Sequence, residues 1–134
     1  MRKKNNLNEA QRTFMIFYPQ IIELLRLIAS PFEIQIGSFP EDEFPPDEIA
    51  DEVDYKNIIA ESLYKNGFIN SNKYKSISNI NENFGRFDKE DWTIEAMKTS
   101  SNWIFIRELA IEALKEFGVE YAKPNLYWYP IITL

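Results

Sequence analysis

Carboxylates crowd one short stretch of the sequence and are its most prominent chemical feature. Residues 41–54, EDEFPPDEIADEVD, hold eight acidic side chains in fourteen positions and no basic one. These side chains are Glu41, Asp42, Glu43, Asp47, Glu48, Asp51, Glu52 and Asp54. The rest of the chain sums to +2, whereas the whole chain carries −6. The acidity is therefore local, and a local charge creates a directed electrostatic field.

Two interpretations of this stretch remain open. In a helix that begins at Pro45-Pro46, carboxylates in the first turn favour the helix dipole by about 0.3–1 kcal/mol each. Asp47 and Asp51 are four residues apart, however, as are Glu48 and Glu52, and such like-charged pairs repel by about 0.2–0.5 kcal/mol. The segment is not optimised for its own stability. We predict that all eight carboxylates bind a partner; the alternative is a solvated face.

Catalytic and metal-binding chemistry finds little support. The chain has no histidine and no cysteine, which removes the commonest general base, the commonest metal ligand and any thiolate nucleophile. A calcium-binding EF-hand loop requires an internal glycine, but residues 41–54 contain none and are interrupted by two prolines. The four glycines are scattered and form no phosphate-binding loop. We therefore predict no metal, no cofactor and no enzymatic activity. A carboxylate-dependent hydrolase remains an alternative, because two carboxylates suffice for glycoside hydrolysis.

Two further features have both a structural and a functional interpretation. Arg107 stands inside an apolar helical segment, where an arginine either reaches the helix edge or pairs with a buried carboxylate. Tyr127, Trp128 and Tyr129 form an aromatic run that either closes the core or anchors an interface. No basic surface with interleaved aromatic residues is present, so nucleic-acid binding is not predicted.

The hydrophobic pattern predicts a mainly α-helical single domain over residues 8–134, preceded by a basic, flexible N-terminus over residues 1–7. Asn8 is placed to cap a first helix that Pro19 kinks or splits and Ser30-Pro31 ends. Further helices are expected from Pro45 to Gly67 with a bend near Asp54, after Asp91 as a cap, and over residues 102–117, and a weaker helical pattern covers residues 71–85. Ser100, Ser101 or Asn102 is expected to cap the helix over residues 102–117. Beyond the bend, the apolar face is expected to continue through Tyr55, Ile58, Ile59 and Leu63.

The helix over residues 102–117 is expected at the centre of the core, because Trp103, Ile106, Ala110 and Phe117 line one face. At most one short strand pair is expected, between residues 32–36 and the closing NLYWYPIITL. The apolar run over residues 14–28 is too polar to span a bilayer, and no signal-peptide cleavage site follows the basic start. We therefore expect a cytoplasmic protein with no membrane association.

FPPDEIADEVDY followed by DWTIEAMKTSSNWIFIRELAIEALKEFG resembles small bacterial immunity proteins of polymorphic or contact-dependent toxin systems. In those proteins an acidic segment precedes a helix of the type Trp-x-x-x-Arg-x-x-Ala-x-x-Ala-Leu. The positions that match here are Trp103, Arg107, Ala110, Ala113 and Leu114. The resemblance covers residues 40–118. Because such families share no single fold, it implies no particular architecture.

The resemblance implies a cytoplasmic, non-catalytic protein that binds one cognate toxin domain and blocks its active site. Many such toxins are nucleases, whose clefts are basic because they bind phosphates. A compact acidic surface would be steered to such a basic toxin domain. The main alternative is an acidic interaction or regulatory domain with another protein partner.

Overall fold

The computed structural model describes residues 2–129, and the side chains of residues 8–129. The chain forms, in order, α1 (Arg2–Ala29), α2 (Phe32–Gly37), α3 (Pro45–Lys65), α4 (Ser71–Phe84), the 3-10 turn η1 (Lys89–Asp91), α5 (Ile94–Thr99) and α6 (Ser101–Glu116). The described residues contain no strand. The prediction of a mainly α-helical single domain is confirmed, and residues 120–129 follow α6 without regular structure.

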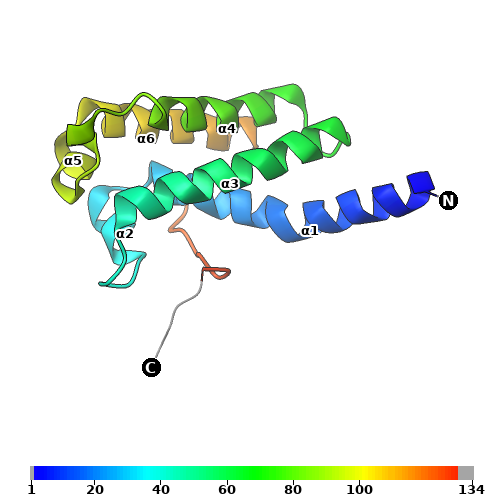
Figure 1. Ribbon diagram of the computed structural model, residues 1–134, viewed down its shortest axis with the longest axis horizontal. Helices are drawn as coiled ribbons and strands as arrows, with labels where there is room; N and C mark the ends of the chain where they lie inside the picture. Colours follow the sequence, from blue (N-terminus) through cyan, green and yellow to red (C-terminus); the bar gives the residue numbers. More distant parts are fainter. Residues whose placement is uncertain (1, 130–134) are drawn as a thin grey trace.

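The four long helices form a bundle in which the chain alternates in direction (Figure 1). Helix α1 packs against α3 and α6, and α4 packs against the same two helices. Helix α6 carries its buried residues at the spacing that the sequence indicates, and Trp103, Ile106 and Ala110 are all within 1% of full burial. Its predicted place in the core is confirmed.

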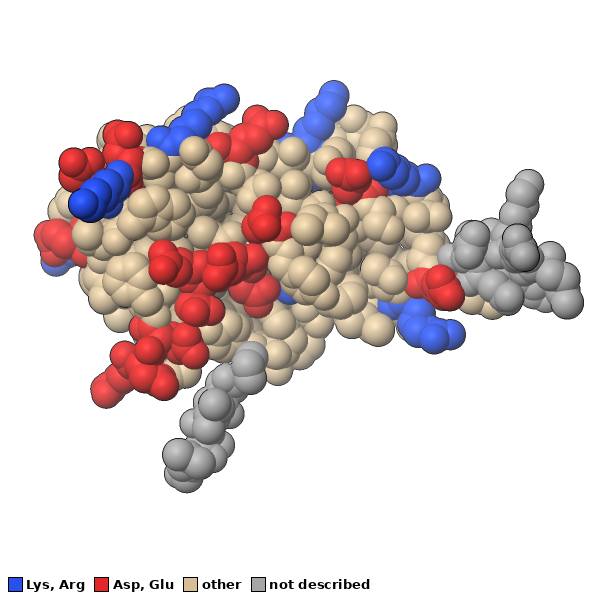
Figure 2. All heavy atoms as spheres, viewed as in Figure 1, with Lys and Arg blue, Asp and Glu red and all other residues tan. Residues whose placement is uncertain are grey.

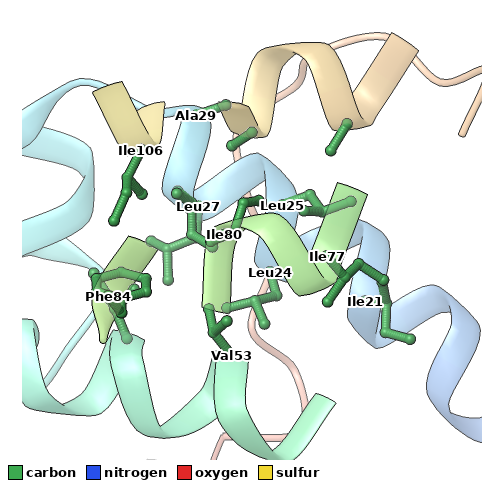
Figure 3. Packing of buried hydrophobic residues seen from close by; sticks show 14 of the residues in the cluster. Ile21, Leu24, Leu25, Leu27, Ala29, Val53, Ile77, Ile80, Phe84 and Ile106 are labelled. Carbon is green, nitrogen blue, oxygen red and sulfur yellow. The ribbon is translucent and has the colours of Figure 1, made fainter. Parts of the chain in front are cut away.

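Apolar side chains from all four long helices meet in one continuous core. Figure 3 shows Ile21, Leu24 and Leu25 of α1 facing Ile77 and Ile80 of α4, with Val53 of α3 and Ile106 of α6 at the sides. Each such side chain contributes about 1.5–3 kcal/mol when it is fully removed from water. This core gives α3 a rigid support, and α3 carries five of the eight carboxylates of the acidic stretch.

The entry to α6 is held by a cluster of polar contacts that we call the Asp91 junction. The Asp91 carboxylate accepts hydrogen bonds from Ser100 Oγ (2.6 Å), Asn102 Nδ2 (2.8 Å) and the backbone N–H of Asp88 (2.9 Å). The Trp103 indole donates to the Asp91 backbone carbonyl at 2.8 Å. These contacts, the Ser100 bond foremost, lower the pKa of Asp91 below its ordinary value.

Several predicted boundaries at the start of the chain are wrong. Helix α1 begins at Arg2 and not after an Asn8 cap. Of the two effects predicted for Pro19, a kink or a split, the split is wrong, because α1 continues through Pro19. Residues 32–37 form the short helix α2 and not a strand, which removes one half of the predicted strand pair. Helical geometry lets the buried Gln35 donate to the Ile28 carbonyl at 3.0 Å, so it satisfies a free acceptor at the end of α1. Residues 130–134, within the other half, lie outside the described residues.

Two predictions further along the chain are also wrong. Helix α3 runs without a break through Asp54. Thr93, and not Asp91, caps α5 by accepting a hydrogen bond from the Ala96 N–H at 3.0 Å. Ser100 caps α6, as one of the predicted alternatives has it.

Arg107 takes a structural role, as one of its two interpretations proposes. Its guanidinium donates to the backbone carbonyls of Ser30, at 3.0 Å, and Met97, at 3.3 Å. The partners are carbonyls, not the predicted carboxylate. Arg107 thereby joins α6 to the ends of α1 and α5.

Candidate functional site

The acidic surface consists of the eight carboxylates of residues 41–54, and the fold brings them onto one side of the molecule. Figure 2 shows acidic side chains gathered over the N-terminal half of α3 and the loop before it. Pro45 and Pro46 are buried at the start of α3 and fix the entry of the helix. Glu41, Asp42 and Glu43 lie in the loop, and the other five carboxylates lie on α3.

The five carboxylates on α3 divide between two faces of the helix. Asp47, Asp51 and Asp54 are exposed on the outer face at the i, i+4, i+7 spacing. Glu48 and Glu52 are half-buried and turn towards residues 128 and 129. The sequence analysis treated the eight carboxylates as one group, but in the structure only six of them are available at the surface. Glu41, Asp42, Asp47, Asp51 and Asp54 are exposed, and Glu43 is partly exposed.

Two members of the acidic surface have a raised pKa. The pKa of Asp51 rises because burial disfavours its charged form and because Glu48 and Asp47 add negative charge nearby. The pKa of Glu43 rises chiefly because of a hydrogen bond with the Glu48 side chain. Burial, a hydrogen bond from a protonated neighbour and nearby negative charge all favour the protonated form of a carboxyl group. The surroundings of Asp51 and Glu43 therefore disfavour their charged forms.

Lys56 is the only basic residue that forms a salt bridge with any of the eight carboxylates in the described part of the chain. Its ammonium lies 3.1 Å from Glu52 Oε2, and the side chain is 1% exposed. The rings of Phe17, Tyr55 and Trp128 surround the ammonium, with centroids at 5.8, 5.1 and 4.9 Å. A buried lysine of this kind is held by one charged partner and by cation–π contacts.

Sequence reasoning missed Lys56 although a signal was present. Ile49, Val53, Lys56, Ala60 and Leu63 are spaced by three or four residues and form the buried stripe of α3. We predicted instead that the apolar face would pass through Tyr55 and Ile58, which are 51% and 65% exposed. The lysine takes the core-facing position because its partner Glu52 lies one turn away on the same helix.

The aromatic run, residues 127–129, contacts members of the acidic surface, which neither of its two interpretations predicts. Tyr127 is exposed, but Trp128 and Tyr129 are half-buried against α3. The Trp128 indole donates to Glu52 Oε1 at 2.7 Å, and the Tyr129 hydroxyl donates to Glu48 Oε2 at 2.8 Å. Burial and the Glu48 carboxylate raise the pKa of Tyr129, so this hydroxyl keeps its proton and remains a donor. Two members of the acidic surface are therefore engaged by the chain itself.

Five hollows of the described surface are lined by residues other than the eight carboxylates. Small-molecule sites are usually concave and largely apolar. Within residues 2–129, no group of three or more carboxylates is arranged to hold a metal ion. The acidic surface lies instead on α3 and the loop before it.

Comparisons with known proteins found no matching family model, no similar curated protein and no similar solved structure. Of the helices described, none has the length and apolar character needed to cross a membrane.

Proposed function

We propose that this protein is a non-catalytic binding protein whose acidic surface docks a basic surface of a protein partner. The observation that carries the proposal is the unbalanced charge on the outer face of α3. Asp47, Asp51 and Asp54 stand exposed on a rigid helix, and none of them forms a salt bridge with a described residue. Asp54 accepts a long hydrogen bond from Asn81 Nδ2, at 3.5 Å, and that neutral amide leaves the charge of Asp54 in place. Charge that no basic side chain balances favours an external partner.

The partner that best fits is a basic toxin domain, and the protein would then act as a cytoplasmic immunity protein. Support comes from the resemblance over residues 40–118 and from the physics of association. A basic cleft that binds phosphates attracts a compact acidic face, which raises the association rate. A helical bundle without histidine or cysteine lacks nothing that a pure binder needs.

The test begins with capture of a partner from the native host and measurement of its association rate by stopped flow at several salt concentrations. The variant Asp47→Asn, Asp51→Asn, Asp54→Asn removes three exposed charges from the acidic surface. A matched control, Glu108→Gln, Glu112→Gln, Glu116→Gln, removes three exposed charges from α6. We expect slower association and a flatter salt dependence for the first variant, and rates close to those of the parent for the second.

Equal effects of the two variants would mean that net charge alone matters, and the proposed site would be wrong. Co-expression separates immunity from other binding. If the captured partner arrests growth and the parent protein restores it, while the triple aspartate variant restores it less well, the immunity function is supported. A captured partner without toxicity would favour the alternative of an acidic interaction or regulatory domain.

A further inference from the structure

The segment over residues 120–129, which we call the C-terminal strap, crosses from α6 to the acidic surface. It leaves α6 at Gly118, whose φ of 71° lies in the left-handed region and turns the chain. In Figure 1 the strap descends from the end of α6 past α1. Its last described residues lie against α3. No backbone–backbone hydrogen bond joins the strap to any helix within residues 2–129.

Side-chain contacts along α1 hold the first half of the strap. Arg26 donates to the Glu120 carbonyl at 3.0 and 3.1 Å, and the hydroxyls of Ser30 and Tyr121 lie 2.8 Å apart. The backbone N–H of Asn125 donates to Glu23 Oε1 at 2.9 Å. This half is tied to one face of α1 and does not touch the acidic surface.

Two aromatic side chains hold the second half, each through the same combination of contacts. The Trp128 ring lies over the Lys56 ammonium while its N–H bonds Glu52. The Tyr129 ring packs edge-on against Phe39, with centroids 5.2 Å apart, while its hydroxyl bonds Glu48. Each aromatic ring therefore packs through its face or edge against a group of the protein, and its N–H or O–H donates a hydrogen bond to a carboxylate. Paired contacts of this kind are typical of binding pockets for aromatic anchors.

The strap fills this place without packing tightly. A hollow of about 210 Å³ remains between the strap and the end of α2, lined by Gly37, Ser38 and residues 123–127 and 129. Tyr127, beside the two anchors, is 57% exposed. A segment with few backbone bonds and incomplete packing opens at low free-energy cost compared with a core helix.

We infer that the flank of α3 around Glu48 and Glu52 is a binding site for paired aromatic side chains that carry hydrogen-bond donors, and that Trp128 and Tyr129 fill it in cis. A protein partner would present the same chemistry, namely adjacent tryptophan or tyrosine residues beside its basic groups, and would displace the strap. The role of the partner rests on the proposed function, whereas the site itself does not.

The experiment tests the site without any natural partner. The probe is the acetylated and amidated peptide Asn-Leu-Tyr-Trp-Tyr, which copies residues 125–129. The full chain is compared with the variant Trp128→Ala, Tyr129→Ala, which vacates both positions. Binding of the labelled peptide is followed by fluorescence anisotropy, and circular dichroism checks the fold. A second variant, Trp128→Phe, Tyr129→Phe, keeps both rings and removes both donors.

We expect the vacated variant to bind the peptide about tenfold more tightly than the parent, because a short tether gives the cis ligand an effective concentration on the order of millimolar. The phenylalanine variant should lie between them. A control peptide with phenylalanine at all three aromatic positions should bind the vacated variant more weakly. Equal binding to parent and vacated variant, or none to either, overturns the inference. Neither result bears on the proposed function, which the triple aspartate variant tests separately.

Discussion

The Asp91 junction and the acidic surface are both built from carboxylates, but these carboxylates have different roles. At the junction, one carboxylate receives three hydrogen-bond donors from three residues, and its pKa is lowered. On the outer face of α3, the carboxylates face one another instead, and the pKa of Asp51 is raised. The first arrangement stabilises the folded state at neutral pH, and the second does not.

The difference separates carboxylates that hold the fold from those that the fold merely displays. Apart from the first-turn position of Asp47, which favours the helix dipole, the placing of Asp47, Asp51 and Asp54 on one helical stripe costs stability, because their repulsion raises the free energy of the folded chain. Glu52 belongs with Asp91 in this respect, since it accepts from Trp128 and pairs with Lys56. Three variants test whether this division is correct.

The largest effect is expected for Glu52→Gln, which leaves the buried Lys56 ammonium without its charged partner. Breaking a buried pair from one side typically costs 3–5 kcal/mol, and because Glu52 is partly exposed we expect roughly 2–4 kcal/mol of lost stability. The matched control is Glu52→Gln combined with Lys56→Met, which removes the stranded charge and keeps an acceptor for Trp128. Urea unfolding should place this double variant within about 1 kcal/mol of the parent. A double variant no more stable than the single one would show that Lys56 is not held by its charge partner.

A smaller loss is expected for Asp91→Asn, about 1–3 kcal/mol at pH 7, because an amide cannot accept all three donors as a carboxylate does. The pH dependence has a definite sign. Since the folded pKa lies below the ordinary value of 3.8, the contribution of Asp91 is fully present above that value. It is lost as the pH falls further towards the folded pKa. The stability gap between parent and variant, measured by urea unfolding, should therefore narrow below about pH 3.8; a gap that does not depend on pH would contradict this assignment.

Helical periodicity was sufficient to predict the four long helices and the buried face of α6, because core burial repeats at three and four residues. It failed where a charged residue takes a core position. The spacing of Glu52 and Lys56 allows an ion pair, but the periodicity does not place the lysine in the core. Its pairing with Glu52 and the ring of Trp128 explain its burial. Trp128 lies 76 residues from Glu52 in the sequence, and no local pattern reports such a contact. The short period-2 pattern of residues 32–36 misled for a related reason, since no neighbouring strand exists among the described residues to pair with it.

Composition alone was sufficient to identify the acidic stretch, but not to predict which of its carboxylates are exposed and which are engaged by the chain itself. Helical spacing places Asp47 and Asp51 on one stripe of α3, and Glu48 and Glu52 on the adjacent stripe. The two stripes carry equal charge. Lys56 and the C-terminal strap engage the second stripe, whereas the first stripe is exposed.

The most direct test of this account is the stability of Asp47→Asn, Asp51→Asn, Asp54→Asn by urea unfolding at pH 7. Loss of the first-turn charge of Asp47 costs about 0.3–1 kcal/mol, and relief of repulsion returns about 0.2–0.5 kcal/mol per pair, so the two nearly cancel. Because the folded pKa of Asp51 is raised, acidification from pH 7 towards 4 should stabilise the parent relative to the variant. We predict that the free energy of unfolding of the variant lies within about 1 kcal/mol of that of the parent at pH 7. As the pH falls, the parent should become more stable relative to the variant. A loss well above 1 kcal/mol at pH 7 would show that these carboxylates hold the fold, and the acidic surface would not be a site kept for a partner.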